Sequence, residues 1–416
     1  MKFKVSIFFI LYFFLLTPIL KLNVINVHTG YVVLLCLFLF KKSFFNEIIN
    51  NKPFLLTCFL FYLFWVNYLI NSILYFNNWG FDFIFFKVTS SFLICVVFGY
   101  FLRIYIEKGK AEDINSFDFI FNLTFLIVLF NSMIVLMEVI FPEFKSIVES
   151  ILVPNDGGIN YDAKTGRGTI RFRGFANTGG AILSIFHSII GLLFFWFAAI
   201  QNKLTHIRFI LIFIIICLSL LFIGRTGILN LIIFLPVIYI LKSTISLQPK
   251  MIFFILFVLL IVFYLPILLE AYMTPFMYEY SFSFFLKGLE GLKQEGTVDK
   301  ITAFYHYPFD PFKLFFGIGY YQGSFIHSWG VDAGYMKSFT SMGLLGSLIF
   351  YLIPLYLIIM IFIRNNISMH IKAAYLILYF IILFNEIKEP TLAQGPAGRF
   401  FLCLLGFGLA EKRTFT

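Results

Sequence analysis

Long apolar segments are the feature that most constrains this chain. They run for about 15 to 25 residues, long enough to cross a bilayer as helices, and recur along the whole sequence. Their hydrophobicity does not alternate from residue to residue, which argues against the strands of a β-barrel, and helices satisfy their own backbone hydrogen bonds inside lipid. The chain is 61% hydrophobic and only 12% charged, whereas soluble domains carry about 25% charged residues. We therefore predict an all-α polytopic integral membrane protein.

About twelve transmembrane helices follow from this pattern, within a single transmembrane domain of residues 1–416. We place them roughly at 5–20, 24–40, 54–75, 83–102, 118–141, 178–200, 208–223, 227–241, 251–270, 335–362, 371–387 and 397–410. The first segment lacks the small-residue cleavage site of a signal peptide, so we interpret it as a span. Only GRTG separates the seventh span from the eighth, which leaves either a tight reversal or a broken helix.

The distribution of Lys and Arg predicts the orientation. With the N-terminus inside, the inner segments hold most of the basic residues, and the short outer segments hold far fewer. Both termini are therefore predicted to be cytoplasmic, which for a bacterial protein means the cytoplasmic side of the inner membrane. Two large loops, at about 142–177 and 271–334, then lie on the periplasmic side.

Several functional classes are disfavoured by what the sequence contains. The net charge of +10 is scattered between apolar segments and forms no basic stripe, so nucleic acid is not an expected partner. The five cysteines all fall inside apolar segments and are interpreted as small buried hydrophobic residues. GxxxxGK[ST], D-x-D, HExxH and Cys/His clusters are absent, so we expect neither a metal nor a cofactor. An enzyme on the outer face must then use a substrate already activated in the membrane.

The segment RFRGFANTGG, residues 171–180, predicts an anion site. Arg171 and Arg173 precede an apolar helix for which Asn177 is a candidate N-cap. A helix N-terminus favours anions, and guanidinium groups bind phosphate in a bidentate manner. Arg225, in GRTG, is either a second phosphate ligand or a side chain that extends to lipid head groups. The alternative for all these arginines is contact with head groups or with their own loop.

Candidate proton acceptors follow in two later outer segments. His327 and Asp332 lie in a Gly-rich, aromatic segment before a span, and histidine transfers protons readily near neutral pH. Glu386 and Lys388 lie in NEIKEPTLAQGPAGR, where Glu386 is a third candidate base and Lys388 a further cation for a diphosphate. The structural alternatives are a loop histidine, a capping aspartate and salt bridges to the arginines.

The chain resembles the O-antigen polymerase family (Wzy), within the wider group of polymerases and ligases that act on undecaprenyl-diphosphate glycans. The resemblance covers the whole chain in its layout of about a dozen spans with two large periplasmic loops. Its local features are Arg171, Gly174 and Asn177, then GRTG at 224–227, then GIG followed by D-x-G-Y and GLLG within 317–346. Their order and their common side of the membrane support the resemblance.

The resemblance implies a glycosyltransferase of lipopolysaccharide biosynthesis. Such an enzyme joins undecaprenyl-diphosphate-linked oligosaccharide units at the periplasmic face, without metal or cofactor. The family implicates arginines of its two large loops, and by position Arg171, Arg173 and Arg225 are the candidates to hold the donor diphosphate. Our own hypothesis is that His327, Asp332 or Glu386 takes the proton of the acceptor hydroxyl. The expected partners are the lipid-linked oligosaccharide, membrane lipids and, as a candidate, a chain-length regulator protein. The second large loop carries no arginine, which departs from the family.

Three alternatives stay open. An O-antigen ligase has a similar layout and the same donor but transfers the polymer to the lipid A core. A polysaccharide flippase or other transporter also has about twelve spans, but transporters usually place ionisable residues near the middle of the membrane. Apart from Lys87 and Glu138, the predicted spans are nearly free of charge, which favours an enzyme. A capsule or exopolysaccharide polymer is an alternative product.

Overall fold

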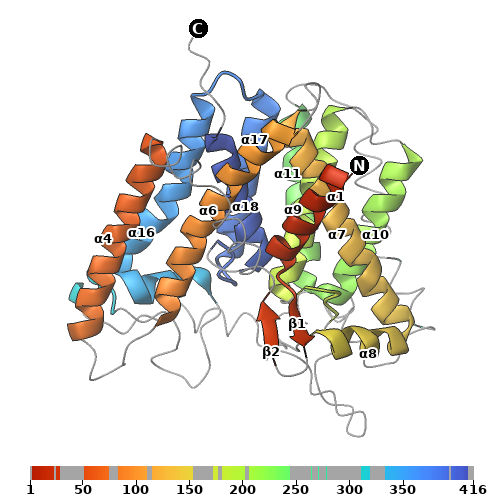
Figure 1. The fold of residues 1–416 in the computed structure, drawn as a ribbon, viewed down its shortest axis with the longest axis horizontal. Coiled ribbons are helices and arrows are strands. Elements are labelled where there is room, and N and C mark those ends of the chain that lie inside the picture. Colours follow the sequence, from red (N-terminus) through yellow and green to blue (C-terminus); the bar gives the residue numbers. More distant parts are fainter. Residues whose placement is uncertain are drawn as a thin grey trace, which may run out of the picture. The chain divides into compact units, whose positions relative to one another are not determined.

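The structure, a computed structural model, describes residues 2–22, 25–28, 51–74, 83–109, 115–152, 172–176, 180–201, 206–243, 311–318, 333–392 and 395–410, with three single residues between 264 and 278. Helices dominate these residues (Figure 1). They are α1 (Lys2–Leu16), α4 (Lys52–Leu74), α6 (Phe83–Gly109), α7 (Ser116–Ile140), α8 (Pro142–Ile151), α9 (Ala181–Ile200), α10 (Ile207–Ile223), α11 (Arg225–Ser243), α15 (Pro311–Phe316), α16 (Gly334–Phe362), α17 (Met369–Asn385) and α18 (Gly395–Leu409).

The helices confirm the predicted helical, membrane-protein character. Helices α4, α6, α7, α9 and α16 are long and apolar enough to cross a membrane. Helices α1, α10, α11, α17 and α18 are apolar but shorter. These helices coincide with all the predicted spans except the second and the ninth. The number of crossings and the sidedness of the loops stay predictions.

The predicted spans near the N-terminus need correction. α1 ends at Leu16, earlier than the predicted 20, and Pro18 follows with no N–H to continue a helix. The second span, predicted at 24–40, is wrong at its start, because the strands β1 (Ile19–Leu22) and β2 (Ile25–His28) pair in antiparallel fashion there. Isoleucine and valine in this stretch favour extended backbone. The rest of this span, and nearly all of the ninth at 251–270, lie outside the described residues.

The chain divides into two compact units. Unit 1 consists of Met1–Cys36 and Phe117–Thr297, and unit 2 of Leu37–Ser116 and Val298–Thr416. Unit 1 holds α1, both strands and nearly all of α7 through to α11, and unit 2 holds α4, α6 and α15 to α18. The single transmembrane domain of residues 1–416 stays a prediction.

Helix α9 is largely buried within unit 1. It runs antiparallel to α10, since Phe194 of α9 stacks on Phe209 at the start of α10 with ring centroids 4.7 Å apart. It runs parallel to α11, because Gly180 just before α9 lies against Gly224 just before α11. Gly224 alone joins α10 to α11, so GRTG makes the tight reversal rather than a break within one helix.

Small residues let α9 and α11 approach closely. A Cβ atom added to Gly227 would lie 2.5 Å from the carbonyl oxygen of Ser184. In the space that glycine leaves, the Gly227 N–H donates to Ser184 Oγ at 3.1 Å, and Asn230 Nδ2 donates to Ser188 Oγ at 3.1 Å. In lipid, burying apolar side chains contributes little to helix association, because the lipid tails are equally apolar. Close packing of small residues and interhelical hydrogen bonds hold helices together instead.

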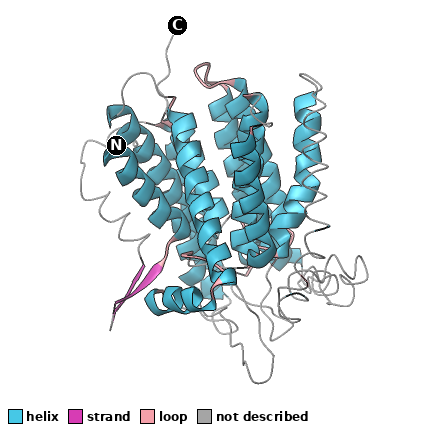
Figure 2. Cartoon of the chain, turned by 90° about the vertical axis from the view of Figure 1, so that its right-hand side faces the viewer, coloured by secondary structure: helices cyan, strands magenta, loops and turns pink. Residues whose placement is uncertain are grey.

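Helix α8 and the strand pair lie at one end of unit 1. α8 crosses the end of α7, with the strands beside it (Figures 1 and 2). Val148 and Leu152 pack with Ile134 of α7 in a buried cluster, whereas Ile147 and Ile151 are exposed. This two-faced pattern is typical of a helix that lies in the membrane interface. The predicted loop 142–177 therefore begins as a helix rather than as irregular chain.

In unit 2, α16 is broken near its start. Gly343 has φ +67° and interrupts the helix, and a Cβ there would lie 2.3 Å from the carbonyl oxygen of Phe315 in α15. Asn71 of α4 donates through Nδ2 to the carbonyl oxygen of Phe316 at 2.7 Å. Non-helical backbone within a helix bundle is tolerated where neighbouring groups satisfy it. A segment of the predicted loop 271–334 is therefore fixed against α4 and α16.

The contact between α9 and α11 gives a first prediction. Gly227→Ala should lower the free energy of unfolding by about 1–3 kcal/mol, because its methyl group has to displace the backbone of α9. The measurement is thermal unfolding of the detergent-solubilised protein. Gly191→Ala is the control, since a Cβ at this buried position of α9 meets nothing closer than a side-chain methyl of Ile216 at 3.5 Å. Equal stability of the two variants would contradict the close contact.

Candidate functional site

The short loop that carries Arg173 is docked onto α7 by its backbone. The Phe175 N–H donates to Asn131 Oδ1 at 3.1 Å, and Asn131 Nδ2 donates to the carbonyl oxygen of Arg173 at 3.2 Å. The Gly174 N–H donates to Glu138 Oε2 at 3.2 Å. Gly174 has φ +57°, and a Cβ there would lie 2.5 Å from Asn131 Oδ1, so this position requires glycine. Two polar side chains of α7 thus determine where the arginine emerges.

Buried side chains of α7, α9 and α10 fix the Asn131 amide in turn. Since Asn131 Oδ1 accepts the Phe175 N–H, its Nδ2 faces His187 Nε2 on α9 at 3.2 Å. Nε2 must then be the acceptor, so the ring proton resides on Nδ1 and points to Ser132 Oγ at 3.1 Å. Ser132 Oγ lies 2.9 Å from Ser219 Oγ of α10. His187 therefore fits this network as a neutral ring with a defined tautomer.

Two helix N-termini lie beside the Arg173 loop. Gly224 lies so close to Gly180 that a Cβ on Gly224 would be 2.9 Å from the Gly180 carbonyl, which brings the starts of α11 and α9 together. Phe172 of the loop meets Phe222 near the end of α10, with ring centroids 6.1 Å apart. Each helix N-terminus carries a partial positive charge, and Arg225, the first residue of α11, adds a full charge. This end of unit 1 is suited to an anion.

Acidic side chains moderate the positive charge at this end. Arg173 is half-buried, and burial lowers its pKa, while the carboxylates of Glu138 and Glu149 act in the opposite direction. Lys145 of α8 pairs with Glu149 at 3.8 Å and lies 4.9 Å from the ring centroid of Phe172. Arg173 thus stays cationic in a partly enclosed setting, where a charge-assisted hydrogen bond to an anion is stronger than in open water.

The structure describes only part of the predicted site. Arg173 and Arg225 are brought to the same end of unit 1, whereas Glu386 and Lys388 belong to unit 2. Arg171, Asn177, His327 and Asp332 lie outside the described residues. The roles predicted for all eight side chains stay predictions.

Glu386 is enclosed at the turn that follows α17. Its Oε1 accepts the N–H of Leu392, and its Oε2 accepts the hydroxyl of Tyr351 at 2.9 Å. Gly334, the first residue of α16, lies directly against this carboxyl group, where a Cβ would not fit. Burial raises the pKa of Glu386 to about 7, although Leu392, Tyr351 and the charge of Lys337 act to lower it. Glu386 therefore holds the 386–392 turn against the start of α16. That start, Gly334, follows Asp332 by two positions in the sequence.

Sequence reasoning missed the residues that support the arginine loop. Asn131, Glu138 and His187 all lie inside predicted spans, and the structure gives each a partner in the loop network. Glu138 was noted only as one of the few charges within a span. The available signal was that ionisable side chains inside a membrane span are costly and face polar partners.

The His187 tautomer yields a second prediction. Because the Gln amide oxygen can occupy the position of Nε2, His187→Gln should keep an acceptor for Asn131 and leave the Arg173 loop in place. His187→Asn reaches only the position of Nδ1, so it should free the Asn131 amide and raise hydrogen exchange of residues 172–176 by about tenfold, as expected for a lost bond of about 1.4 kcal/mol. The measurement is hydrogen–deuterium exchange by mass spectrometry. Equal protection in the two variants would refute the assignment.

A third prediction concerns pH. A carboxyl group whose pKa is higher in the folded protein binds more protons when folded, so the free energy of unfolding falls as pH rises. For Glu386 the fall extends from its ordinary pKa near 4.5 to about 7 and amounts to about 3 kcal/mol. Glu386→Gln should remove this dependence. Thermal unfolding of both proteins between pH 5 and 8 tests it, and parallel pH profiles would show that the carboxyl group is not the cause.

Comparisons with known proteins give no match from which a role for this site could be transferred. No family model matches the chain, and neither a curated protein nor a solved structure matches it. The resemblance to the O-antigen polymerases therefore rests on the sequence features given above.

Proposed function

We propose that this chain is a membrane glycosyltransferase that polymerises oligosaccharide repeat units carried on undecaprenyl diphosphate, at the periplasmic face of a bacterial inner membrane. The donor is the growing chain on its lipid carrier, and the acceptor is a hydroxyl group of a new lipid-linked unit. The product is a surface polysaccharide such as O antigen. A chain-length regulator is a candidate partner.

One observation carries the proposal: Arg173, Arg225 and the N-termini of α9 and α11 gather at one end of unit 1. Parallel helices with adjacent N-termini place like partial charges together, and Arg225 increases the repulsion. A bound diphosphate would relieve it and would engage both guanidinium groups. The orientation predicted from the basic residues puts this end on the outside, where a lipid-linked donor is the available activated sugar.

The chemistry requires a stabilised leaving group and a proton acceptor. The C1–O bond of the donor breaks with its electron pair passing to the diphosphate, whose developing charge Arg173, Arg225 and the two N-termini stabilise. Such preorganised charge is often the largest contribution to catalysis. The acceptor hydroxyl oxygen forms the new bond to C1 and gives up its proton to a base, a transfer worth about 10²–10⁴-fold in rate.

Glu386 is poorly suited to act as the base, because its carboxyl group is buried and already hydrogen-bonded. Both of its oxygens accept hydrogen bonds, from Leu392 and Tyr351, and it is buried. We therefore assign proton transfer to Asp332 or His327, and to Glu386 the positioning of the α16 start that follows Asp332. Arg171 and Asn177, which adjoin the Arg173 loop in the sequence, are proposed as further groups around the diphosphate.

A fourth prediction tests the arginines. Arg173→Ala and Arg225→Ala should each lower polymer formation by about 10²–10³-fold, the usual cost of removing one preorganised charge-stabilising group. The measurement is the lipopolysaccharide ladder of a deletion strain complemented with each variant, at membrane protein levels matched by immunoblot. Arg208→Ala is the control, since Arg208 is an exposed cation at the opposite end of α10. A full ladder from either arginine variant would refute its assigned role.

The lipopolysaccharide of the gene-deletion strain distinguishes a polymerase from a ligase and from a flippase. Core oligosaccharide with a single repeat unit and no ladder indicates a polymerase. Core with no repeat and lipid-linked polymer at the outer face indicates a ligase, and core with no repeat and no such polymer indicates a flippase. An unchanged ladder would place the product in capsule or exopolysaccharide.

A further inference from the structure

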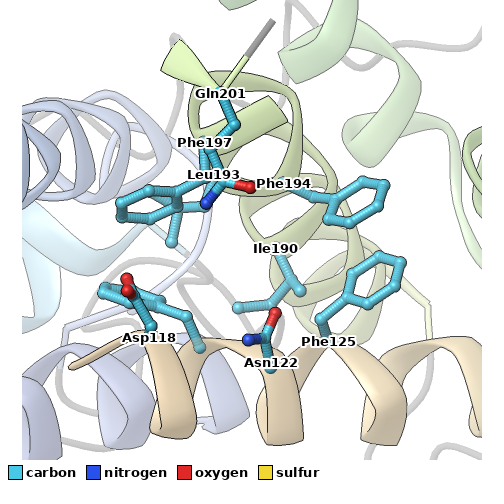
Figure 3. Close-up of a pocket in the computed structure, with 9 residues that line it drawn as sticks. Asp118, Asn122, Phe125, Ile190, Leu193, Phe194, Phe197 and Gln201 are labelled. Atoms are coloured by element: carbon cyan, nitrogen blue, oxygen red, sulfur yellow. The ribbon is translucent and has the colours of Figure 1, made fainter. Parts of the chain in front are cut away.

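A small pocket lies between the start of α7 and the end of α9, away from the Arg173 loop. Four phenylalanines and two aliphatic residues form its apolar part, and three polar side chains point into it (Figure 3). Its lining consists of Asp118, Phe121, Asn122, Phe125, Ile190, Leu193, Phe194, Phe197 and Gln201. Phe125 and Phe194 stack with ring centroids 3.7 Å apart, which gives this part of the pocket a firm aromatic wall.

The three polar residues of the pocket are exposed. Asp118 and Asn122 come from successive turns of α7, and Gln201 follows the last turn of α9. Within the part of the chain that the structure describes, none of the three side chains is hydrogen-bonded or ion-paired to another residue. The side chains of all three residues line the same small pocket (Figure 3). A carboxylate and two side-chain amides beside aromatic rings offer oxygen acceptors and ring faces suited to an ammonium group.

The charges of the pocket favour a cation over an anion. Among the described residues that line the pocket, Asp118 alone carries a formal charge. The C-terminus of α9, at Ile200, adds a partial negative charge from carbonyl groups left without helical partners. The opposing positive end of α7 is offset by Asp118 itself, which lies in its first turn.

We propose that this pocket binds the primary ammonium head group of an aminophospholipid such as phosphatidylethanolamine. The three N–H donors of the head group match the carboxylate of Asp118 and the amide oxygens of Asn122 and Gln201. The aromatic wall and the aliphatic residues accommodate the start of the lipid body. In the predicted orientation this end of α7 and α9 lies at the inner leaflet. A trimethylammonium group has no N–H to donate, so phosphatidylcholine should bind poorly. The site is independent of the proposed glycosyl transfer.

Lipid binding to the purified full-length protein tests this proposal. The protein in detergent is titrated with phosphatidylethanolamine, phosphatidylcholine or phosphatidylglycerol of the same acyl chains, with bound lipid counted by native mass spectrometry. We expect at least tenfold tighter binding of phosphatidylethanolamine than of the other two, and loss of this preference in Asp118→Asn. Gln201→Leu, which removes a different acceptor, should weaken the preference as well. Glu143→Gln, which removes an exposed acid of α8 in the same unit, is the matched control and should keep it.

The possible outcomes decide the proposal. Equal binding of the three lipids, or an unchanged preference in Asp118→Asn, would overturn it. Glycerophosphoethanolamine, which carries the same head group without acyl chains, identifies the source of the ammonium. If it competes as strongly as the lipid, the ligand is a soluble amine and the lipid assignment is wrong. If it does not compete and the preference depends on Asp118, the aminophospholipid site is established.

Discussion

The close approach of α9 and α11 determines where unit 1 concentrates positive charge. Two parallel helices in contact carry dipoles that repel, so this arrangement needs a specific source of attraction. Gly227 supplies it by letting the helices approach closely enough for its N–H to reach Ser184 Oγ. The consequence is that the starts of both helices, with Arg225 as the first residue of α11, meet at one end. A bulkier residue at Gly227 would separate them and disperse the charge.

The Arg173 loop depends on a second constraint, which is that polar groups inside lipid must find partners. Asn131 meets this requirement for the Arg173 carbonyl and the Phe175 N–H together, and Glu138 does so for the Gly174 N–H. His187 then needs to be neutral to accept from Asn131. Each hydrogen bond in this network limits the orientation of the next side chain. The short loop that carries Arg173, part of the predicted outer loop 142–177, is therefore held at a defined place.

The sequence predicted most of the helices, because apolar length and low charge are enough to specify a membrane span. It did not predict the strand at Ile25–His28 or the break at Gly343, since both occur within apolar sequence where composition carries little positional information. Arg173 and Arg225 stood out as cations at span ends, and the structure brings their segments together. The partners Asn131 and His187 were not found, because apolar spans without strong amphipathicity do not show which face of a helix meets another.

Helix α9 connects the two ends of unit 1 through its own dipole. Its N-terminus lies with Arg225 and the Arg173 loop, where an anion is favoured, and its C-terminus faces Asp118, where a cation is favoured. That polarity would stabilise an anionic ligand at the first end and an ammonium group at the second. In the predicted orientation, the proposed anion would lie outside and the proposed ammonium group would lie among the inner head groups. One buried helix would thus supply part of the binding energy at both ends. If the orientation were reversed, the arginines would lie on the cytoplasmic side, away from the periplasmic face where the proposed donor is presented.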